Sequence, residues 1–242
     1  MYLKNLDEDT SVYELDSMQS AHLAKVLRMK EGQEVELFNG SGLSCKAVIV
    51  EISKKFTKVQ ATSSFVSEDM PTKTITAIIP FLKKDNLFYM TQKLTEMGSA
   101  ELAFYKPDKL DQSLFKKDLL KFEKKLKDII IGGCKQSGVN FMPNIKCFQD
   151  LSSCLDDVQI DASKCFTCSF DLNADNKLTT SDFDDCNKYF FITGAESGFS
   201  DKERFNMKER NIAVRSLGKN ILRAETAPIV GVTLFQSFLG RI

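Results

Sequence analysis

The chain has 242 residues, of which 43% are hydrophobic and 27% charged, and 33 Lys and Arg balance 33 Asp and Glu. This is the composition of an ordinary globular protein, long enough for one large domain or for a small and a larger one. No run of about 18 apolar residues is present and the first residues lack a secretory signal, so we exclude membrane-spanning and exported proteins and expect a cytoplasmic location.

Basic charge is unevenly distributed along the chain. Residues 71–148 carry 14 basic against 8 acidic side chains, residues 188–242 carry 9 against 5, and residues 149–187 carry 2 against 9. A basic surplus suits a partner that bears phosphates, although lysine-rich helix faces are often simply solvated. Composition therefore leaves nucleic-acid binding open.

The opening third of the chain predicts a small β-rich module. Residues 34–38 and 43–50 flank an Asn-Gly turn and are expected to pair as a hairpin, with a further strand at 58–61. A capping serine followed by apolar positions at helical spacing predicts a short helix over 20–28. The polar segment 63–71 ends in proline and predicts a linker, so we place a domain boundary near residue 70.

After residue 70 the pattern predicts alternating strands and helices. Strands are expected at residues 74–80, 101–105, 164–170 and 189–193, and amphipathic helices over 87–97 and after Ser113. Ser200 and Glu203 form a capping box that opens another helix. Such alternation is typical of an α/β fold with a mainly parallel sheet covered by helices on both faces.

Seven cysteines at irregular spacing predict reduced thiols rather than disulfides. Cys165 and Cys168 form a Cys-x-x-Cys pair, but an alternating strand would point them to opposite faces, and no second pair supplies two more zinc ligands. Residues 171–182 imitate a calcium loop, yet Asn176 replaces its turn glycine and Asp182 its bidentate glutamate. We therefore expect no metal.

Two glycine-bearing turns near the end of the chain carry the main functional signal. One spans residues 192–200 and the other spans residues 216–228. Glycine lets the backbone approach a flat ligand and offer its own N–H and C=O groups. In parallel sheets ligands bind beyond the carboxyl ends of the strands, where the first turn falls. The two turns are therefore predicted to grip one ligand together.

Five sequence blocks occur in the same order as in a known enzyme family. They are residues 22–28 with Gly32 and 37–42, Gln-Lys-Leu-Thr-Glu-Met-Gly at 92–98, Lys-Gln-Ser-Gly at 135–138 with Pro143, the Gly194 turn with its following Phe-Ser-x-x-Glu, and Leu-Gly-Lys-Asn-Ile-Leu-Arg-Ala-Glu-Thr-Ala at 217–227. By these blocks the chain resembles, along nearly its whole length, the bacterial 16S ribosomal RNA uridine methyltransferases of the RsmE type. That family methylates ring nitrogen 3 of one uracil.

The resemblance implies a fold and a set of partners. Residues 1–70 would form a PUA-like RNA-binding β-barrel, and residues 71–242 a SPOUT methyltransferase domain whose end is threaded into a trefoil knot. The enzyme would be a homodimer that binds S-adenosylmethionine in the knot and acts on 16S ribosomal RNA of the small subunit. DNA and membranes are not expected as partners.

The resemblance also implies which residues hold the cofactor. These are Thr193, Gly194, Ala195, Glu196, Gly198, Leu217, Gly218, Ile221, Leu222, Glu225, Thr226 and Ala227. We expect Arg223 to stabilise the uracil imide anion or anchor the target phosphate, because a guanidinium stays protonated and donates as a planar fork. The alternative is a structural pair with Glu225. The acceptor of the uracil proton is left open between a carboxylate, a water and bulk solvent.

RNA docking is expected to involve basic residues of both domains. The candidates are His22, Lys25, Arg28 and Lys30 in the small domain and Lys83, Lys84 and Lys93 in the large one. The alternative for each lysine is a plain solvated surface, and for His22 a structural position on an apolar helix face.

The chain departs from the family pattern in two blocks. It reads Gly194-Ala-Glu-Ser-Gly198 where the family usually has Gly-Pro-Glu-Gly-Gly, and Val139 stands where the family usually has arginine. A second hypothesis is therefore a related RNA-binding protein that has lost catalysis through its residues at 139, 195 and 197. A third is a methyltransferase that acts on another RNA.

Overall fold

The computed structural model describes residues 1–109, 119–158, 165–184 and 186–242, and it divides into two compact units. The first unit comprises Met1–Met70 and Ser137–Met142, and the second Pro71–Gln136 and Pro143–Ile242. The sequence assigned residues 137–142 to the larger domain. They join the first unit because they pair with its hairpin loop, where Met142 N donates to Gly40 O at 2.9 Å.

The first unit is an antiparallel sheet with a small apolar core. Its strands run in the order β1-β4-β3-β2, and β5 pairs with β3. Their bounds are β1 (Val12–Leu15), β2 (Glu34–Phe38), β3 (Leu43–Ile52), β4 (Thr57–Ala61) and β5 (Val66–Ser67). Leu15, Leu23, Leu37, Ile49 and Val59 are buried at its centre. The predicted hairpin is confirmed as β2 and β3, and β1 and β5 were missed.

The helical segment of this unit begins earlier than predicted. Helix α1 (Ser17–Ala21) continues directly as a π-helix, η1 (His22–Val26). Asp16 is the N-cap, and its carboxylate accepts a hydrogen bond from Gln19 N at 2.8 Å. Ser20, the expected cap, is buried inside the helix and donates to Leu15 O at 3.2 Å. The Asp16 carboxylate thus satisfies one of the free N–H groups of the first turn, so the helix starts after Asp16 and not after Ser20.

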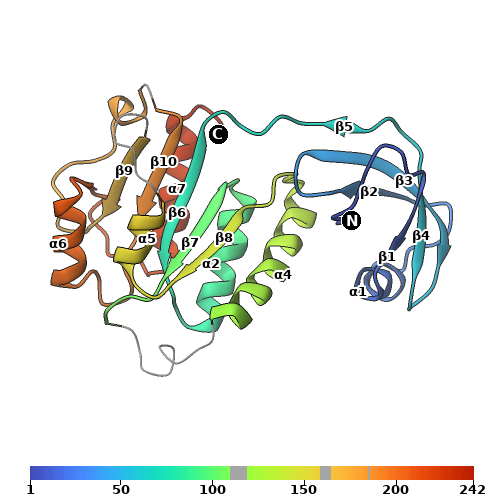
Figure 1. Ribbon diagram of the computed structural model, residues 1–242, viewed down its shortest axis with the longest axis horizontal. Coiled ribbons are helices and arrows are strands. Elements are labelled where there is room, and N and C mark those ends of the chain that lie inside the picture. The colour runs from blue at the N-terminus through green and yellow to red at the C-terminus, as the bar shows by residue number, and fades with distance from the viewer. Residues whose placement is uncertain (110–118, 159–164, 185) are drawn as a thin grey trace. The chain divides into compact units, whose positions relative to one another are not determined.

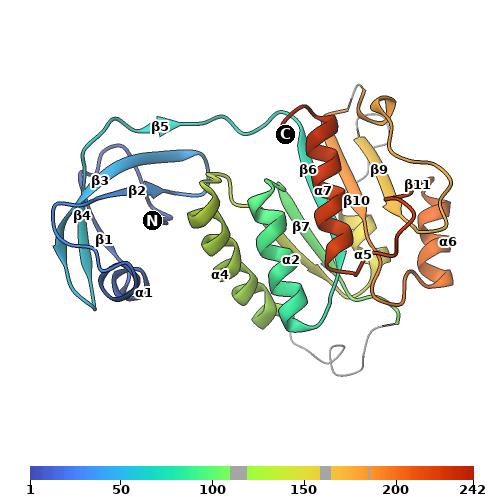
Figure 2. The ribbon, with the colours of Figure 1, turned by 180° about the vertical axis from the view of Figure 1, so that it is seen from behind.

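The second unit is an α/β layer structure around a parallel sheet (Figure 1). Its six strands run in the order β11-β9-β10-β6-β7-β8. The strand bounds are β6 (Thr74–Pro80), β7 (Glu101–Tyr105), β8 (Asn144–Phe148), β9 (Cys165–Phe170), β10 (Lys188–Ile192) and β11 (Ala213–Arg215). The helices are α2 (Lys84–Glu96), α4 (Leu119–Ser137), α5 (Leu151–Asp157), α6 (Asp201–Glu209) and α7 (Thr226–Phe238), with a 3₁₀ turn η2 (Thr180–Phe183). Figures 1 and 2 show α2, α4 and α7 on one face of the sheet and α5 and α6 on the other.

The predicted α/β fold is confirmed, with some elements missed. The strands at 74–80 and 101–105 have the expected bounds, and the capping box of Ser200 and Glu203 opens α6. The strand at 164–170 begins at Cys165 within the described residues, and the start of the helix after Ser113 lies outside them. Elements β8, α5 and β11 carried no pattern strong enough to predict. Within the part of the chain that is described, no helix has the length and apolarity needed to cross a membrane.

An aromatic cluster fixes α7 on the sheet. The ring centroid of Phe235 lies 5.0 Å from that of Phe183, 5.4 Å from Phe191 and 6.2 Å from Phe170. One turn earlier, Gly231 brings the helix backbone close to the same rings, since a Cβ there would lie 2.8 Å from Phe170 Cε2. The start of α7 is thereby held beside the ends of β9 and β10.

We expect Gly231→Ala to lower the free energy of unfolding by about 1–3 kcal/mol, because the added methyl group overpacks the contact with Phe170. The matched control is Gly132→Ala in α4, where an added Cβ meets nothing within 4 Å. That variant should be unchanged or more stable by about 0.5–1 kcal/mol, since alanine is the better helix former. Urea unfolding of both measures the difference, and equal effects would contradict the packing argument.

Candidate active site

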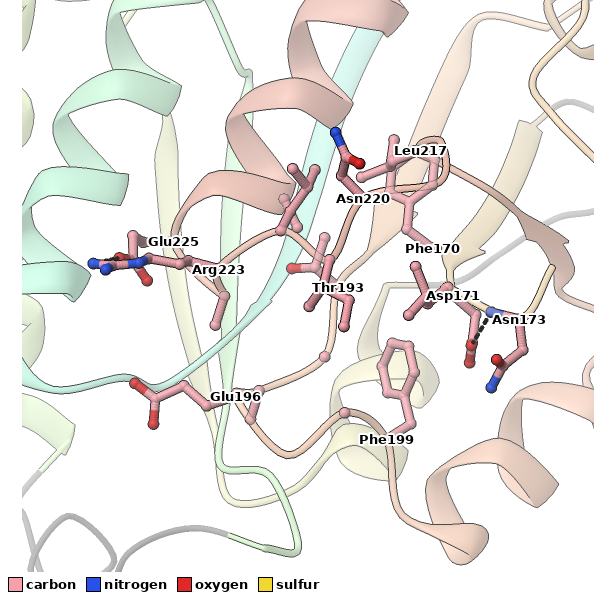
Figure 3. A pocket seen from close by; sticks show the side chains of 18 of the residues that line it. Phe170, Asp171, Asn173, Thr193, Glu196, Phe199, Leu217, Asn220, Arg223 and Glu225 are labelled. Atoms are coloured by element: carbon pink, nitrogen blue, oxygen red, sulfur yellow. Dashed lines mark hydrogen bonds and ion pairs between the residues drawn. The ribbon is translucent and has the colours of Figure 1, made fainter.

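A pocket of about 620 Å³ lies in the second unit beyond the carboxyl ends of β9, β10 and β11 (Figure 3). Three segments wall it: the residues that follow β9, the turn that follows β10, and the loop between β11 and α7. Parallel strands bring their carboxyl ends to one edge of a sheet, which is where ligands of open α/β folds bind. The two glycine turns predicted from the sequence therefore face one cavity.

The turn after β10 depends on two glycines. A Cβ at Gly194 would lie 3.2 Å from both Gly198 C and Phe199 N, so a side chain there would crowd the backbone of the turn. Gly198 adopts a φ of +69°, and its N–H donates to Ala195 O at 2.8 Å to close the turn. Ser200 then caps α6 and donates from Oγ to Asp108 Oδ2 at 2.7 Å. The turn is thus held closed at one end and anchored at the other.

A buried tyrosine fixes the start of this turn by a hydrogen bond. The Tyr105 hydroxyl donates to the carbonyl oxygen of Thr193 at 2.8 Å. Burial raises the pKa of Tyr105 well above its usual value, so the hydroxyl stays a neutral donor. Thr193 is 1% exposed, and its Oγ1 has no hydrogen-bond partner among the described residues. A polar ligand in the pocket would satisfy that hydroxyl.

The loop between β11 and α7 is fastened by a partly buried ion pair. Arg215 donates from Nε and NH2 to the two carboxylate oxygens of Asp182, at 3.0 and 2.5 Å. Burial alone would raise the pKa of Asp182, but the hydrogen bonds from Arg215 and Thr179 outweigh it and hold the pKa below its usual value. Ser216 follows at once, and its N–H donates to Asn176 O at 2.7 Å. The segment that begins with Leu217 and Gly218 therefore follows two residues whose positions are fixed by hydrogen bonds.

The third wall follows β9 and was missed from the sequence. Asp171 lines the pocket with a side chain only 8% exposed, pairs with Arg204 of α6, and accepts from Asn173 N at 3.0 Å. The Arg204 guanidinium lies 5.8 Å from the ring centroid of Phe199. The other lining residues that we did not predict are Asn86, Phe170, Leu172, Asn220 and Ala224. The strand at 164–170 was predicted, so the rule that ligands lie beyond strand ends would have pointed to Asp171.

The structure brings most of the predicted cofactor residues together. Those that line the pocket are Thr193, Gly194, Ala195, Glu196, Gly198, Leu217, Gly218, Ile221, Leu222, Glu225 and Ala227. Thr226 is not among the lining residues. It is the first residue of α7, and its N–H donates to Arg223 O at 2.9 Å.

Arg223 lies at the pocket with its side chain 86% exposed. Its NH1 is 3.9 Å from Glu225 Oε1, a long contact that adds little stability at this exposure. Glu225 is 12% exposed and also accepts from Asn86 Nδ2 at 3.3 Å. In Figure 3, Arg223 and Glu225 lie on one side of the pocket, and Asp171 and Asn173 lie on the other. Arg223 and Glu225 therefore do not form a strong structural ion pair.

The predicted RNA-contacting residues differ in their surroundings. In the first unit His22, Lys25, Arg28 and Lys30 are all exposed along or just after η1. In the second unit Lys83 and Lys84 are exposed at the start of α2. Lys93 is half-buried and already engaged, because its Nζ binds Glu96 at 2.8 Å and lies 5.9 Å from the Tyr89 ring. It is the least available cation of this set.

Two features that depart from the family pattern do not obstruct the pocket. Ser197 is exposed and is not a lining residue, so its side chain adds nothing to the cavity wall. Ala195 lines the pocket with a methyl group and keeps the carbonyl that closes the turn. In the described ranges no group of His, Cys, Asp and Glu side chains is arranged to hold a metal, and all seven cysteines are unbridged.

Comparison with known families identifies the class of protein. Residues 68–236 match the family described as RNA methyltransferase domain, and residues 15–61 match the RNA methyltransferase PUA domain. The chain therefore belongs to the RNA methyltransferase family, and it is an enzyme of that class. The resemblance drawn from the sequence is confirmed.

Individual relatives agree with that assignment. The chain is 26% identical to ribosomal RNA small subunit methyltransferase E of Buchnera aphidicola, over 99% of this chain and 93% of the relative. It is 25% identical to the enzyme of the same name from Bacillus subtilis, over 93% of this chain and 90% of the relative. A curated relative thus spans nearly the whole chain.

Solved structures show the same fold. A Legionella pneumophila methyltransferase in complex with its bound cofactor SAM has a TM-score of 0.85 at 24% identity, covering 98% of this chain and 96% of its own. Ribosomal RNA small subunit methyltransferase E from Neisseria gonorrhoeae, bound to S-adenosylmethionine, has a TM-score of 0.82 at 22% identity, covering 98% and 95%. The expected α/β fold with a mainly parallel sheet and a small amino-terminal PUA-like domain is confirmed.

Asp182→Asn is expected to lower the free energy of unfolding by about 1–3 kcal/mol at neutral pH, because Arg215 loses its charged acceptor. The folded pKa of Asp182 is depressed, so its contribution is complete above the ordinary aspartate pKa of about 3.9 and is lost as the pH falls through the lower folded value. Denaturant unfolding at a series of pH values should show wild type and variant converging in that acidic window.

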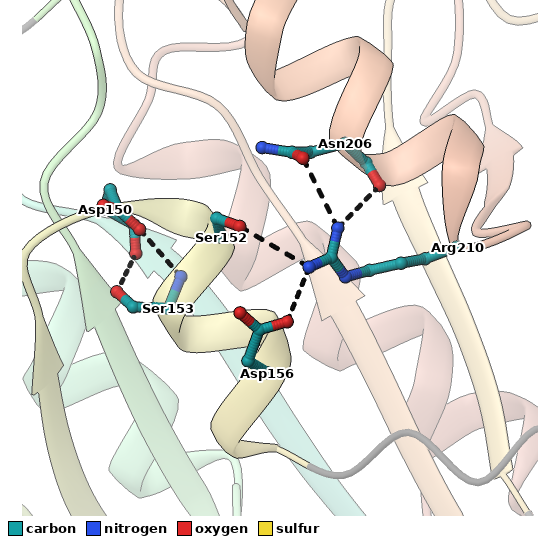
Figure 4. Close-up of polar contacts among 6 residues, drawn as sticks. All are labelled: Asp150, Ser152, Ser153, Asp156, Asn206 and Arg210. Carbon is teal, nitrogen blue, oxygen red and sulfur yellow. Dashed lines mark hydrogen bonds and ion pairs between the residues drawn. The ribbon is translucent and has the colours of Figure 1, made fainter.

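The control for this experiment is Asp156→Asn. Asp156 also pairs with an arginine, Arg210 at 2.6 Å, but its side chain is 65% exposed (Figure 4). We expect a change within about 0.5 kcal/mol there, since exposed pairs contribute little. A difference between wild type and Asp182→Asn that does not vary with pH would contradict the electrostatic account.

Proposed function

We propose that this protein transfers a methyl group from S-adenosylmethionine to ring nitrogen 3 of a uridine in ribosomal RNA of the small subunit. The observation that carries the proposal is the convergence of two glycine turns on one pocket, with the exposed guanidinium of Arg223 beside it. The names of the full-length relatives and the cofactor bound in two solved neighbours support it.

The pocket residues fit a nucleoside cofactor. Gly194 lines the pocket without a side chain, Leu217 and Leu222 supply apolar walls, and Thr193 offers a buried hydroxyl without a partner among the described residues. These groups would hold the adenosyl part of S-adenosylmethionine, which supplies an electrophilic methyl group on its sulfonium. The chain's own contribution is then to fix both reactants in line and to exclude water.

Arg223 is the residue we assign to the target base. Ring nitrogen 3 of uracil carries a proton on its pairing edge, so the base must be unpaired or extruded, and its imide must become anionic before it attacks the methyl group. A guanidinium remains protonated and donates as a fork, which suits that anion or the neighbouring phosphate. The proton itself leaves to a pocket carboxylate, a water or bulk solvent.

The RNA would be positioned through phosphates by exposed basic side chains. In the first unit these are His22, Lys25, Arg28 and Lys30, and in the second Lys83 and Lys84. Lys93 would have to leave Glu96 to take part. Because ribosomal RNA is modified where ribosomes are made, we also place the protein in the cytoplasm.

We infer a homodimer and a knotted carboxyl-terminal segment as parts of the same proposal. Helix α7 is apolar around most of its circumference, yet Ile229, Val230 and Leu234 remain half-exposed on the side away from the Phe235 cluster. A helix that is hydrophobic all round is ordinarily buried, so a second copy of the chain would cover this side. The trefoil knot stays a prediction from the family resemblance.

The proposal is tested directly with undermethylated small ribosomal subunits. We expect the purified protein and S-adenosylmethionine to introduce one N3-methyluridine, detected by mass spectrometry of nucleosides and by a block to primer extension at one site. A protein that binds no S-adenosylmethionine in calorimetry even at millimolar concentration would instead support the RNA-binding relative without catalysis. A methyl group in another RNA would support the third hypothesis.

Arg223→Ala is expected to lower the single-turnover methylation rate by roughly 100-fold or more, because a charge-stabilising donor is lost. The affinity for S-adenosylmethionine and the free energy of unfolding should change little, since the side chain is 86% exposed. Arg223→Lys should recover part of the rate, and Arg210→Gln is the control. A variant with wild-type rate would remove Arg223 from the mechanism.

Leu234→Lys on α7 is expected to convert a dimer into a monomer, because a charge would be buried in the apolar contact. Light scattering coupled to gel filtration measures the mass. The control is Phe205→Lys on α6, a side chain 62% exposed on the other face of the sheet, which should stay dimeric. A wild-type mass of one chain at micromolar concentration would overturn the dimer.

A further inference from the structure

A buried carboxylate, that of Asp171, forms the β9 side of the pocket. Asp171 is the first residue after β9, and its carboxylate lines the cavity while only 8% exposed. Such a buried charge is costly unless it is paired and hydrogen-bonded. Here Arg204 binds Oδ2, and Asn173 N donates to Oδ1 at 3.0 Å. The carboxylate is therefore held in one orientation.

This carboxylate still has acceptor capacity to spare. A carboxylate has about four lone-pair sites on its two oxygens. The described residues fill one site on Oδ1 and one on Oδ2. Counted over the contacts of the described residues, Asp171, which lines the pocket, has two further acceptor sites. Because Arg204 already balances its charge, it suits uncharged hydroxyl donors better than a second cation.

The sheet register places Asp171 beside the glycine turn. Strands β9 and β10 run parallel, with Ser169 opposite Ile192. Continued two residues past these positions, the same register brings Asp171 level with Gly194, and both residues line the pocket. An acidic residue at the end of the strand beside a glycine-rich turn hydrogen-bonds a ribose hydroxyl in dinucleotide-binding folds, for the same geometric reason. In Figure 3, Asp171 also lies across the pocket from Arg223, away from the expected target base.

We propose that Asp171 binds the ribose hydroxyls of the methyl donor and that Arg204 acts as a positioning residue for its carboxylate. This assignment rests on the proposed function, since it concerns the same pocket. Arg204 holds Asp171 from α6 while its own guanidinium packs near Phe199. The ribose, a neutral diol, would add hydrogen bonds to a carboxylate that accepts only two from the described residues.

The test compares ligands that differ only in the hydroxyls. Calorimetry measures the affinity of wild type and Asp171→Asn for 5′-methylthioadenosine and for its 2′-deoxy and 3′-deoxy derivatives. A hydrogen bond to a charged acceptor corresponds to a loss of roughly 10-fold to 100-fold in affinity, which we expect for Asp171→Asn with the intact ribose. For at least one deoxy derivative the loss should shrink to about threefold or less, because the bond is already absent.

Arg204→Gln should show the same pattern in weaker form, with Arg204→Lys closer to wild type. The matched control is Asp156→Asn. The carboxylate of Asp156 pairs with Arg210, which caps the carboxyl end of α6, the helix that carries Arg204, and both residues lie outside the pocket (Figure 4). The control variant should bind every ligand as wild type does. A purely structural role of Asp171 would weaken all ligands equally, and that outcome overturns the assignment.

S-Adenosylhomocysteine separates the remaining outcomes, because it adds the amino-acid tail to the same ribose. If Asp171→Asn weakened this ligand but left 5′-methylthioadenosine unchanged, the carboxylate would bind the tail and the ribose assignment would be wrong. Wild type that binds S-adenosylhomocysteine while Asp171→Asn binds every ligand equally well overturns the assignment alone. Wild type that binds neither ligand overturns the proposed function and the assignment with it.

Discussion

The contact on which the pocket depends is the close approach of the backbone within the turn after β10. Gly194 lies so near the backbone of Gly198 and Phe199 that even a methyl group would be crowded at 3.2 Å. The constraint is local, yet its effect is not, because the closed turn sets where Thr193 and Glu196 stand relative to the loop before α7. A side chain at Gly194 would push against the backbone of Gly198 and Phe199 and strain the closed turn.

The turn after β10 and the loop between β11 and α7 are each held by a polar group that is distant in the sequence. Tyr105 binds the Thr193 carbonyl across 88 residues, and Arg215 binds Asp182 across 33. The Tyr105 bond is buried and the Arg215 pair is partly buried. Away from water a hydrogen bond is stronger and an unpaired group more costly. The apolar side of the same arrangement is the Phe235 cluster, which holds α7 on the sheet. The pocket is therefore built on a rigid base, although its rim is exposed.

Sequence patterns predicted the elements whose signal is local and left out those whose stability comes from neighbours. Residues 74–80 and 101–105 are apolar runs bounded by breakers, and the capping box at Ser200 is a local hydrogen-bond pattern, so each was found. Strand β11 has three residues and exists only because β9 offers it a ladder, which no short window of sequence records.

In the pocket, too, the residues with a local sequence signal were predicted and those placed by distant contacts were missed. The two glycine turns were predicted from local sequence. Asp171, in contrast, was read only as the first residue of a segment that imitates a calcium loop. Its environment depends on Arg204, which is 33 residues away in the sequence. The segment 137–142 was likewise assigned by its position in the chain, while its actual partner is the hairpin loop at Gly40.

Four arginines of the second unit show how surroundings, and not residue type, decide what a guanidinium does. Arg215 is 19% exposed and bidentate on a nearly buried carboxylate, so its donors are spent on structure. Arg210 is shared among Asp156, Asn206 and Ser152 on the surface (Figure 4).

Arg204 and Arg223 both reach the pocket, but they face it differently. Arg204 is tied to Asp171 and packs near Phe199, so it can orient a neighbour but has little freedom to follow a substrate. Arg223 is 86% exposed and touches Glu225 only at 3.9 Å, so most of its donors remain available to an incoming anion. Of these two guanidiniums, Arg223 is thus the one that faces solvent, while Arg204 is fixed in the wall of the cavity.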